Sequence, residues 1–204
     1  MAPANSTLER SVTVRHQATA QGEDTIFKTS QVTAFLLMLL VAACASPQPS
    51  RSMIKVPDKL QPGANESLAM IVPAKGVQIY ECRARKDRAG EYEWAFVAPE
   101  ADLFDARGNR AGRHYAGPHW ESPDGSKILG TVKERADAPV AGAIPWLLLA
   151  AKSVGPEGSF SKATSIQRVN TVGGVAPQAG CSQATAGAAA RINYTADYYF
   201  FTAK

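Results

Sequence analysis

The sequence predicts an all-β domain with long loops, either an antiparallel β-sandwich or a barrel-like fold, and two observations lead to this expectation. Apolar and polar residues alternate in short runs, and glycine, proline, asparagine or aspartate separates one run from the next. From residue 66 onward, no sustained run of apolar residues has the spacing of an amphipathic helix. Short strands separated by turns in this way are typical of sandwiches and barrels.

The first predicted strand, residues 76–83, shows the alternation clearly. Val77 and Ile79 would lie on one face of the sheet, and Gln78 and Tyr80 on the other. The further predicted strands are residues 91–97, 113–116, 119–121, 128–133, 144–151, 165–172 and 191–202.

Residues 144–151, IPWLLLAA, form the most apolar segment of the domain. The segment suits a short helix or a strand that is buried on both faces, and the strand character of its neighbours favours the strand. Trp94 and Trp146 are expected in the core. Glycine, proline and charged residues surround Trp120, so its position is less defined and a ligand site is an alternative.

Composition and charge indicate one globular domain after a leader. The chain has 204 residues, of which 45% are hydrophobic and 20% charged, as in ordinary globular proteins. We expect a leader at 1–44, a Pro/Ser-rich flexible tether at 45–65 and one domain at 66–204. The net charge is only +4 and the basic residues lie among acidic ones, so no nucleic-acid partner is expected.

Residues 34–43, AFLLMLLVAA, resemble the apolar core of a signal peptide, because about ten residues are too few to cross a bilayer. The run ends in Val-Ala-Ala-Cys44, which resembles a bacterial lipobox and implies that Cys44 is lipidated and anchors the protein to a membrane. Cleavage after Ala45 is the alternative and would give a soluble secreted or periplasmic protein. Residues 1–29 are unusually polar for a signal peptide, so the true start is expected further along the chain.

Two cysteines remain in the expected domain, Cys82 and Cys181. Export would place them in an oxidising compartment, where an even pair favours a disulfide over free or metal-binding thiols. Neither cysteine belongs to a C-x-x-C motif. The bond would close a loop of about 100 residues, which the chain-entropy treatment values at about 4.7 kcal/mol.

Residues 114–126, HYAGPHWESPDGS, concentrate the side chains with the most chemical potential. His114, His119 and Glu121 would suit zinc or copper if they converged. On one continuous strand, however, the two histidines would point to opposite faces, so a metal site requires the turn at Gly117-Pro118 to bring them together. We expect no cofactor and keep zinc or copper as the alternative.

Hydrolytic chemistry has weaker support. Ser122, Ser126 and Ser161 are present, but none lies in a G-x-S-x-G motif. Glu121 and Asp124 are the candidate pair of carboxylates for glycoside hydrolysis. Asp124 lies in a Pro-Asp-Gly turn, where a carboxylate commonly binds its own backbone, so a structural role is favoured.

A binding module for a small molecule or a glycan is therefore favoured over an enzyme. Aromatic side chains offer large apolar surfaces with polar edges, and Arg168 and Asn170 precede a Gly-Gly loop that suits the border of a cleft. The residues expected to bind the ligand are His114, Tyr115, His119, Trp120, Glu121, Arg168 and Asn170.

Several long segments resemble one protein family. These are GVQIYEC, WAFVAPEADLFDARGNRAGRHYAGPHWESPDGSKILGTV, AIPWLLL, IQRVNTVGGVAPQAGC and YTADYYFF, which together span most of residues 77–201. They are similar to the DUF3455 family of secreted or lipid-anchored proteins of bacteria and fungi. The resemblance implies an extracytoplasmic β-rich domain at the cell envelope, and it implies no activity and no catalytic residue.

Overall fold

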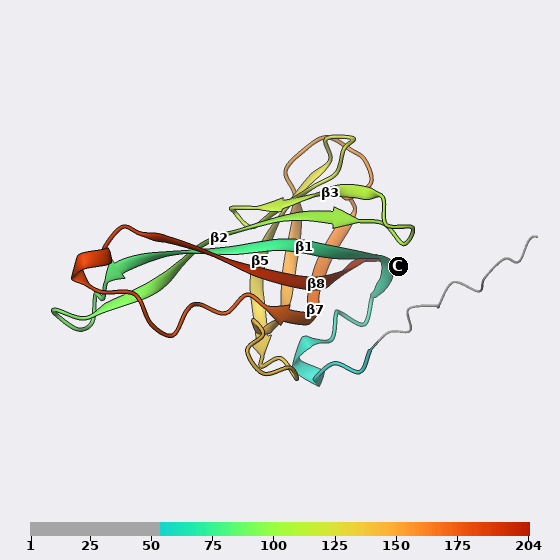
Figure 1. Ribbon diagram of the computed structural model, residues 1–204. Coiled ribbons are helices and arrows are strands. Elements are labelled where there is room, and N and C mark those ends of the chain that lie inside the picture. The colour runs from blue at the N-terminus through green and yellow to red at the C-terminus, as the bar shows by residue number, and fades with distance from the viewer. Residues whose placement is uncertain (1–53) are drawn as a thin grey trace, which may run out of the picture. The chain divides into compact units, whose positions relative to one another are not determined.

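Each strand of the domain pairs with the next along the chain, and the last strand pairs with the first, so that the sheet closes into an antiparallel barrel (Figure 1). This computed structural model describes residues 54–204. The strands are β1 (Glu66–Ala84), β2 (Tyr92–Phe104), β3 (Arg110–Tyr115), β4 (His119–Glu121), β5 (Lys127–Ala136), β6 (Trp146–Ser153), β7 (Ala163–Gly173) and β8 (Ala189–Ala203). Within the described range, no helix has the length and apolarity that crossing a membrane requires. The all-β expectation is confirmed, and the barrel is the alternative that holds.

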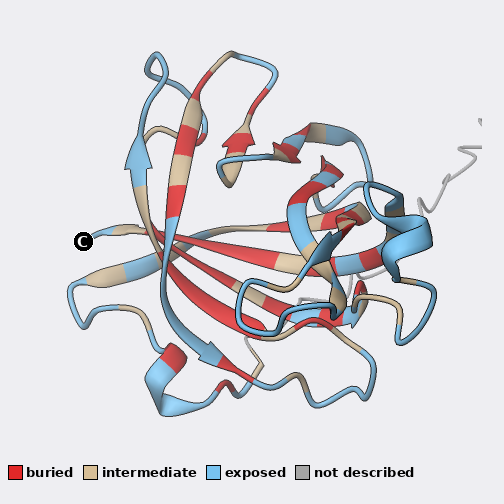
Figure 2. Cartoon of the chain, turned by 90° about the vertical axis from the view of Figure 1, so that its left-hand side faces the viewer, coloured by how far each residue is buried: buried red, intermediate tan, exposed pale blue. Residues whose placement is uncertain are grey.

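The main core lies inside the barrel, because alternate residues of each strand point inward. On β8 the inward residues include Tyr194, Tyr198 and Phe200, as their alternation in the sequence predicts. Figure 2 shows most of the buried residues on the central strands, whereas the loops are mostly exposed. Phe160, from the loop before β7, packs against Phe200 with ring centroids 5.0 Å apart and fills one end of the barrel.

A second core lies outside the barrel. Leu60, at the end of a short 3-10 helix η1 (Asp58–Leu60), is fully buried together with Trp146 and Leu148 of β6. This explains why β6 is apolar on both faces, and it confirms the expected core position of Trp146. The expected tether at 45–65 therefore extends too far, because the part of it from residue 54 onward contributes to the packed domain.

The barrel wall is incomplete on one side because β3 and β4 are short. β2 pairs with β3 only from Ala101 to Phe104, and β5 pairs with β4 only from Lys127 to Leu129. Beyond these contacts, β2 and β5 continue on either side of the turn between β3 and β4. The edge of each strand that faces this turn pairs with no other strand. We call this gap the side opening.

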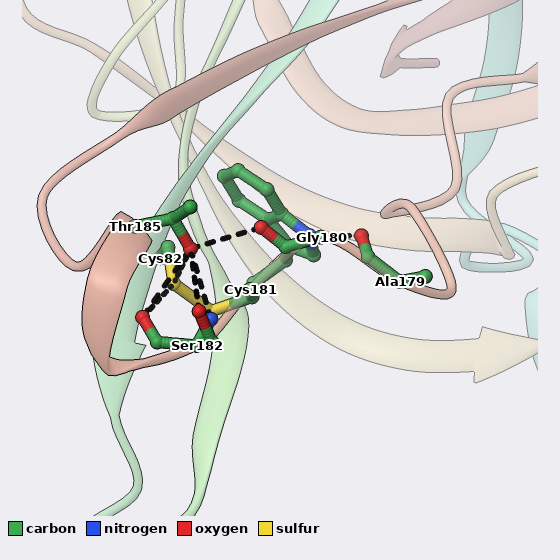
Figure 3. Close-up of a disulfide and its surroundings, with 7 residues drawn as sticks. Cys82, Ala179, Gly180, Cys181, Ser182 and Thr185 are labelled. Carbon is green, nitrogen blue, oxygen red and sulfur yellow. Dashed lines mark hydrogen bonds between the residues drawn. A yellow bond between two sulfur atoms is a disulfide. The ribbon is translucent and has the colours of Figure 1, made fainter.

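An arm extends beyond the rest of the barrel, to the left in Figure 1. It consists of the end of β1, the start of β2 and the start of β8. A disulfide joins Cys82 on the arm to Cys181, 99 residues later in the chain, as the sequence predicts (Figure 3). Thr185, in the second 3-10 helix η2 (Gln183–Thr185), donates its hydroxyl to the carbonyl of Gly180 at 2.9 Å and orders this segment.

Trp94 is not a core residue, in contrast to the expectation. It lies opposite Cys82 on the arm, is partly exposed, and donates Nε1–H to the carbonyl of Ala179 at 2.9 Å. The reason is that this part of β2 lies beyond the closed barrel, so its aromatic ring covers the segment around the disulfide rather than an interior.

Candidate ligand-binding cavity

A cavity of about 430 Å³ enters the barrel at the side opening. Its volume falls within the range of roughly 300–1,000 Å³ that is usual for small-molecule sites. Ile144, Leu147 and Leu149 form apolar walls. The polar side chains that line it include Gln78, Tyr80, His114, Trp120, Arg168 and Tyr198.

Three apolar side chains surround the mouth of the cavity. Phe96 is 53% exposed, Val97 44% and Val132 47%. The pairing of β1 with β2 shifts register here, because Ile79 faces Ala98 while Tyr80 faces Phe96. Val97 is therefore an extra residue, a β-bulge, and such bulges redirect side chains at the rims of barrels. Phe96 and Val97 both line the mouth as a result.

Arg168 is the charged group of the cavity wall opposite the side opening. It lies on β7 next to Tyr198 of β8, and β7 and β8 lie across the barrel from β3 and β4, the short strands at the side opening. Its Nε and Nη2 atoms donate to the backbone carbonyl of Pro145 at 3.1 and 2.8 Å. Within the described part of the chain, the residues that line the cavity include no aspartate or glutamate. The positive charge of Arg168 thus has no counter-charge in the cavity.

Two buried N–H donors in the cavity lining lack an acceptor. Trp120 Nε1 has no hydrogen-bond partner among the described residues, and Gln78 Nε2 makes no hydrogen bond of ordinary geometry there, its polar neighbour being the Tyr194 hydroxyl; the two residues are only 1% and 2% exposed. Leaving a buried donor unpaired costs about 1–3 kcal/mol. The Trp120 ring lies against Gly130, where an added Cβ would stand 2.6 Å from its Cζ3 atom, so the glycine makes room for the indole.

His114 is fully buried and stacks on Trp120 with ring centroids 4.2 Å apart. Burial lowers the pKa of its imidazole to about 3, despite a backbone hydrogen bond that opposes the shift, and the charge of Arg168 adds to the lowering. The ring is therefore neutral near pH 7. Its Nδ1 lies 2.8 Å from the carbonyl oxygen of His119, which can only accept, so Nδ1 carries the proton and Nε2 has the lone pair.

The tyrosines of the cavity are neutral phenols. Burial raises the pKa of Tyr80 and of Tyr198. Tyr80 donates its hydroxyl to the carbonyl of Gly174 at 2.6 Å, and the Tyr198 hydroxyl lies 3.3 Å from that of Tyr194. These groups supply polarity without charge.

The residues of the metal hypothesis do not converge. His114 pairs with Trp120 and faces the interior, whereas His119 and Glu121 alternate with Trp120 on β4 and face outward. Glu121 accepts hydrogen bonds from Arg113 at 2.9 Å and from Tyr115 at 2.5 Å, which lower its pKa. No group of three histidine, cysteine, aspartate or glutamate side chains in residues 54–204 could hold a metal ion.

The remaining candidates lie apart from the cavity. Asn170, in a left-handed conformation with φ of 51°, is exposed and donates to Asp197 at 2.9 Å. The side chains of Ser126 and Ser159, and then their backbone N–H groups at 2.8 and 2.7 Å, hold the pKa of Asp124 below its usual value, and these contacts link two loops. This is the turn-forming role that the sequence favours for Asp124.

The structure thus brings together His114, Trp120 and Arg168 of the seven expected ligand-binding residues. The sequence analysis did not single out Gln78, Tyr80 and Tyr198 as site residues. The alternation of residues 76–83 puts Gln78 and Tyr80 on one face, and a glutamine at an inward position of a strand is the signal that could have identified the site.

A family model described as a protein of unknown function, DUF3455, matches residues 62–202, which is more than half of the chain. The chain belongs to the DUF3455 family. The match contains every residue that lines the cavity, so the cavity is a feature of the DUF3455 domain rather than of an added segment. Neither the curated proteins nor the solved structures yield a match to this chain.

Proposed function

We propose that this DUF3455 domain is a binding module that holds one small, largely apolar molecule in its barrel cavity. The observation that carries the proposal is the combination of an apolar cavity of about 430 Å³ with half-exposed apolar side chains at its mouth. Phe96, Val97 and Val132 remain in contact with water in the empty protein, and a ligand that covers them gains about 25 cal/mol per Å² of apolar surface.

The lining favours binding over catalysis. Within the described residues it includes no serine, threonine, cysteine, lysine, aspartate or glutamate, which are the usual nucleophiles and acids. His114 is the ring that would act as a base, but its depressed pKa makes it a poor proton acceptor near pH 7. A cavity of about 430 Å³ also suits a compact molecule better than a long glycan chain.

The test is titration with N-phenylnaphthylamine, a neutral apolar dye that fluoresces strongly outside water. We expect saturable binding at one site per chain. Val132→Trp should abolish it, because the larger ring would fill the mouth of the cavity. Val154→Trp is the matched control, since Val154 is 41% exposed but does not line the cavity. The proposal fails if the dye does not bind, or if the two variants bind it equally.

Export and lipid anchoring at Cys44 belong to the same proposal. Cys44 and the expected leader lie outside the described residues. The Cys82–Cys181 disulfide supports export, because disulfides persist in oxidising compartments outside the cytosol. A membrane-anchored cavity protein at the cell envelope would meet apolar molecules at the surface where they are released or taken up.

Fractionation of cells tests the anchor. The wild-type chain should appear in the membrane fraction, and Cys44→Ala should release it or prevent its maturation. Mass spectrometry of the mature protein should find acyl chains on Cys44. A Cys44→Ala protein that still co-fractionates with the membrane would exclude lipidation as the anchor.

A further inference from the structure

We infer that the ligand of the cavity is a monocarboxylate with an apolar chain, bound with its carboxylate at Arg168 and its chain directed to the side opening. This deepens the proposed function and rests on it. It assigns Arg168, Gln78 and Trp120 to the carboxylate, and Phe96, Val97 and Val132 to the chain.

The positive charge of Arg168 favours an anionic ligand. Arg168 lines the cavity and its recorded acceptor, the carbonyl of Pro145, is neutral. A guanidinium that is partly withdrawn from water and has no counter-charge favours an anionic ligand, which would supply that counter-charge. No acidic side chain in the described lining competes for the position. An amine ligand is disfavoured for the same reason, because it would add a second positive charge.

Buried N–H donors without acceptors also favour a carboxylate. Gln78 Nε2 and Trp120 Nε1 are buried N–H groups without acceptors, and both residues share the cavity with Arg168. An ionised carboxylate is the group that only accepts, with two oxygens and about four lone-pair sites. It satisfies these donors together with the guanidinium, whereas an alcohol brings a donor of its own.

The number of charges favours a carboxylate over a phosphate. Arg168 is the partly buried cation of the site, whereas Arg135, the other arginine of the lining, is exposed at β5 and screened by water. A monoanion matches this one partly buried positive charge. A phosphate monoester carries nearly two negative charges at pH 7 and would leave one of them uncompensated inside the barrel.

The strand order indicates in which direction the ligand lies in the cavity. Arg168 and Tyr198 are neighbours on β7 and β8, across the barrel from the side opening between β2 and β5. The walls between them carry Leu147 and Leu149. A ligand whose head is bound at Arg168 therefore lays its chain along leucines and ends at the exposed apolar side chains of the mouth.

Calorimetric titration of the full chain with laurate, dodecanol and dodecyl phosphate tests the inference. These ligands have the same chain and differ only in the head. We expect the wild type to bind laurate at least ten-fold more tightly than dodecanol, because a hydrogen bond to a charged group contributes roughly 1.5–3 kcal/mol. Dodecyl phosphate should bind more weakly than laurate.

Arg168→Gln should abolish the preference for laurate and leave the affinity for dodecanol within about two-fold, which also shows that the variant is folded. Arg107→Gln is the matched control and should keep the preference, since Arg107 is exposed in the turn between β2 and β3 and does not line the cavity. A preference that survives in Arg168→Gln would overturn the inference, as would equal binding of laurate and dodecanol by the wild type. Tighter binding of dodecyl phosphate would overturn the choice of carboxylate.

The outcomes separate this inference from the proposed function. If dodecanol binds as well as laurate and the naphthylamine dye is displaced, the cavity is a ligand site but the carboxylate assignment is wrong. If neither laurate nor dodecanol binds and the dye does not bind, both the function and its ligand class are wrong.

Discussion

Two buried glutamines of this barrel should respond oppositely to the same substitution. Gln78 and Gln167 are 2% and 3% exposed. Gln167 donates Nε2–H to the carbonyl of Leu60 at 2.6 Å, whereas Gln78 Nε2 makes no hydrogen bond of ordinary geometry among the described residues. Methionine is unbranched like glutamine and fills similar space, so Gln→Met removes the amide with little change in packing.

The expected magnitudes follow from these contacts. Gln78→Met removes an unsatisfied donor and should raise the free energy of unfolding by about 1–3 kcal/mol. Gln167→Met leaves the buried carbonyl of Leu60 without a donor and should lower it by a similar amount, about 1–3 kcal/mol. For a domain of this size, 1 kcal/mol corresponds to a shift of about 2–4 °C in Tm.

Thermal and urea unfolding of the ligand-free proteins measure both shifts. The melting temperature should rise for Gln78→Met and fall for Gln167→Met, and laurate affinity should fall only for Gln78→Met. If Gln78→Met lowers the stability of the ligand-free protein as much as Gln167→Met does, then Gln78 is satisfied in the folded state. The argument from unpaired donors would then be refuted.

Three further outcomes follow from the structure. Replacing Cys82 and Cys181 by serine should lower the free energy of unfolding by about 2–5 kcal/mol, seen as a reduced urea midpoint, and an unchanged midpoint would mean that the 99-residue loop adds nothing. Burial holds the pKa of His114 near 3, below the unfolded value of about 6.5. The free energy of unfolding should therefore be undiminished by His114 above pH 6.5 and should fall as the pH drops from 6.5 toward 3. Thermal melts at a series of pH values should show a smaller fall in the melting temperature for His114→Gln than for the wild type. An equal fall in both proteins would mean that other groups cause the pH dependence. Leu60→Ala should cost about 2–5 kcal/mol yet preserve dye binding, because Leu60 packs outside the barrel, and loss of dye binding in the folded variant would contradict this separation of cores.

Alternation in the sequence was enough to predict much of the sheet. The central positions of residues 144–151 are all apolar, which predicts a strand buried on both faces. In the structure, one face of β6 lies in the barrel interior and the segment around Leu60 covers the other. The disulfide was also predictable, because only Cys82 and Cys181 remain in the expected domain.

β1 and β2 extend the furthest beyond the segments that the alternation indicates, and each extension passes through a proline. β1 begins at Glu66 and β2 continues to Phe104, beyond the predicted segments, and each extension contains a proline. At Pro73, β1 pairs with β8 alone, and at Pro99, β2 pairs with β1 alone. A strand with one unpaired edge tolerates proline there, because no neighbour requires the missing N–H group.

The site was less predictable, because it depends on strand lengths rather than on a motif. His114 and His119 do face opposite sides, but they lie on two strands rather than on one, and the hairpin register separates them because His119 pairs with Tyr115 while His114 pairs with Trp120. The side opening results from the lengths of β3 and β4 relative to β2 and β5, and the sequence does not show which residues face across it. Arg168 and Gln78 line one cavity only because the closed sheet brings β7 and β1 to the same interior.

A crystal structure of the protein with laurate tests the central claim most directly. The account predicts one laurate in the barrel, with its carboxylate within hydrogen-bonding distance of Arg168 and its chain passing Leu149 to end near Val132. An empty cavity in crystals that contain saturating laurate would contradict the proposed function. A laurate with its carboxylate at the side opening and its chain against Arg168 would contradict the assignment of the head group.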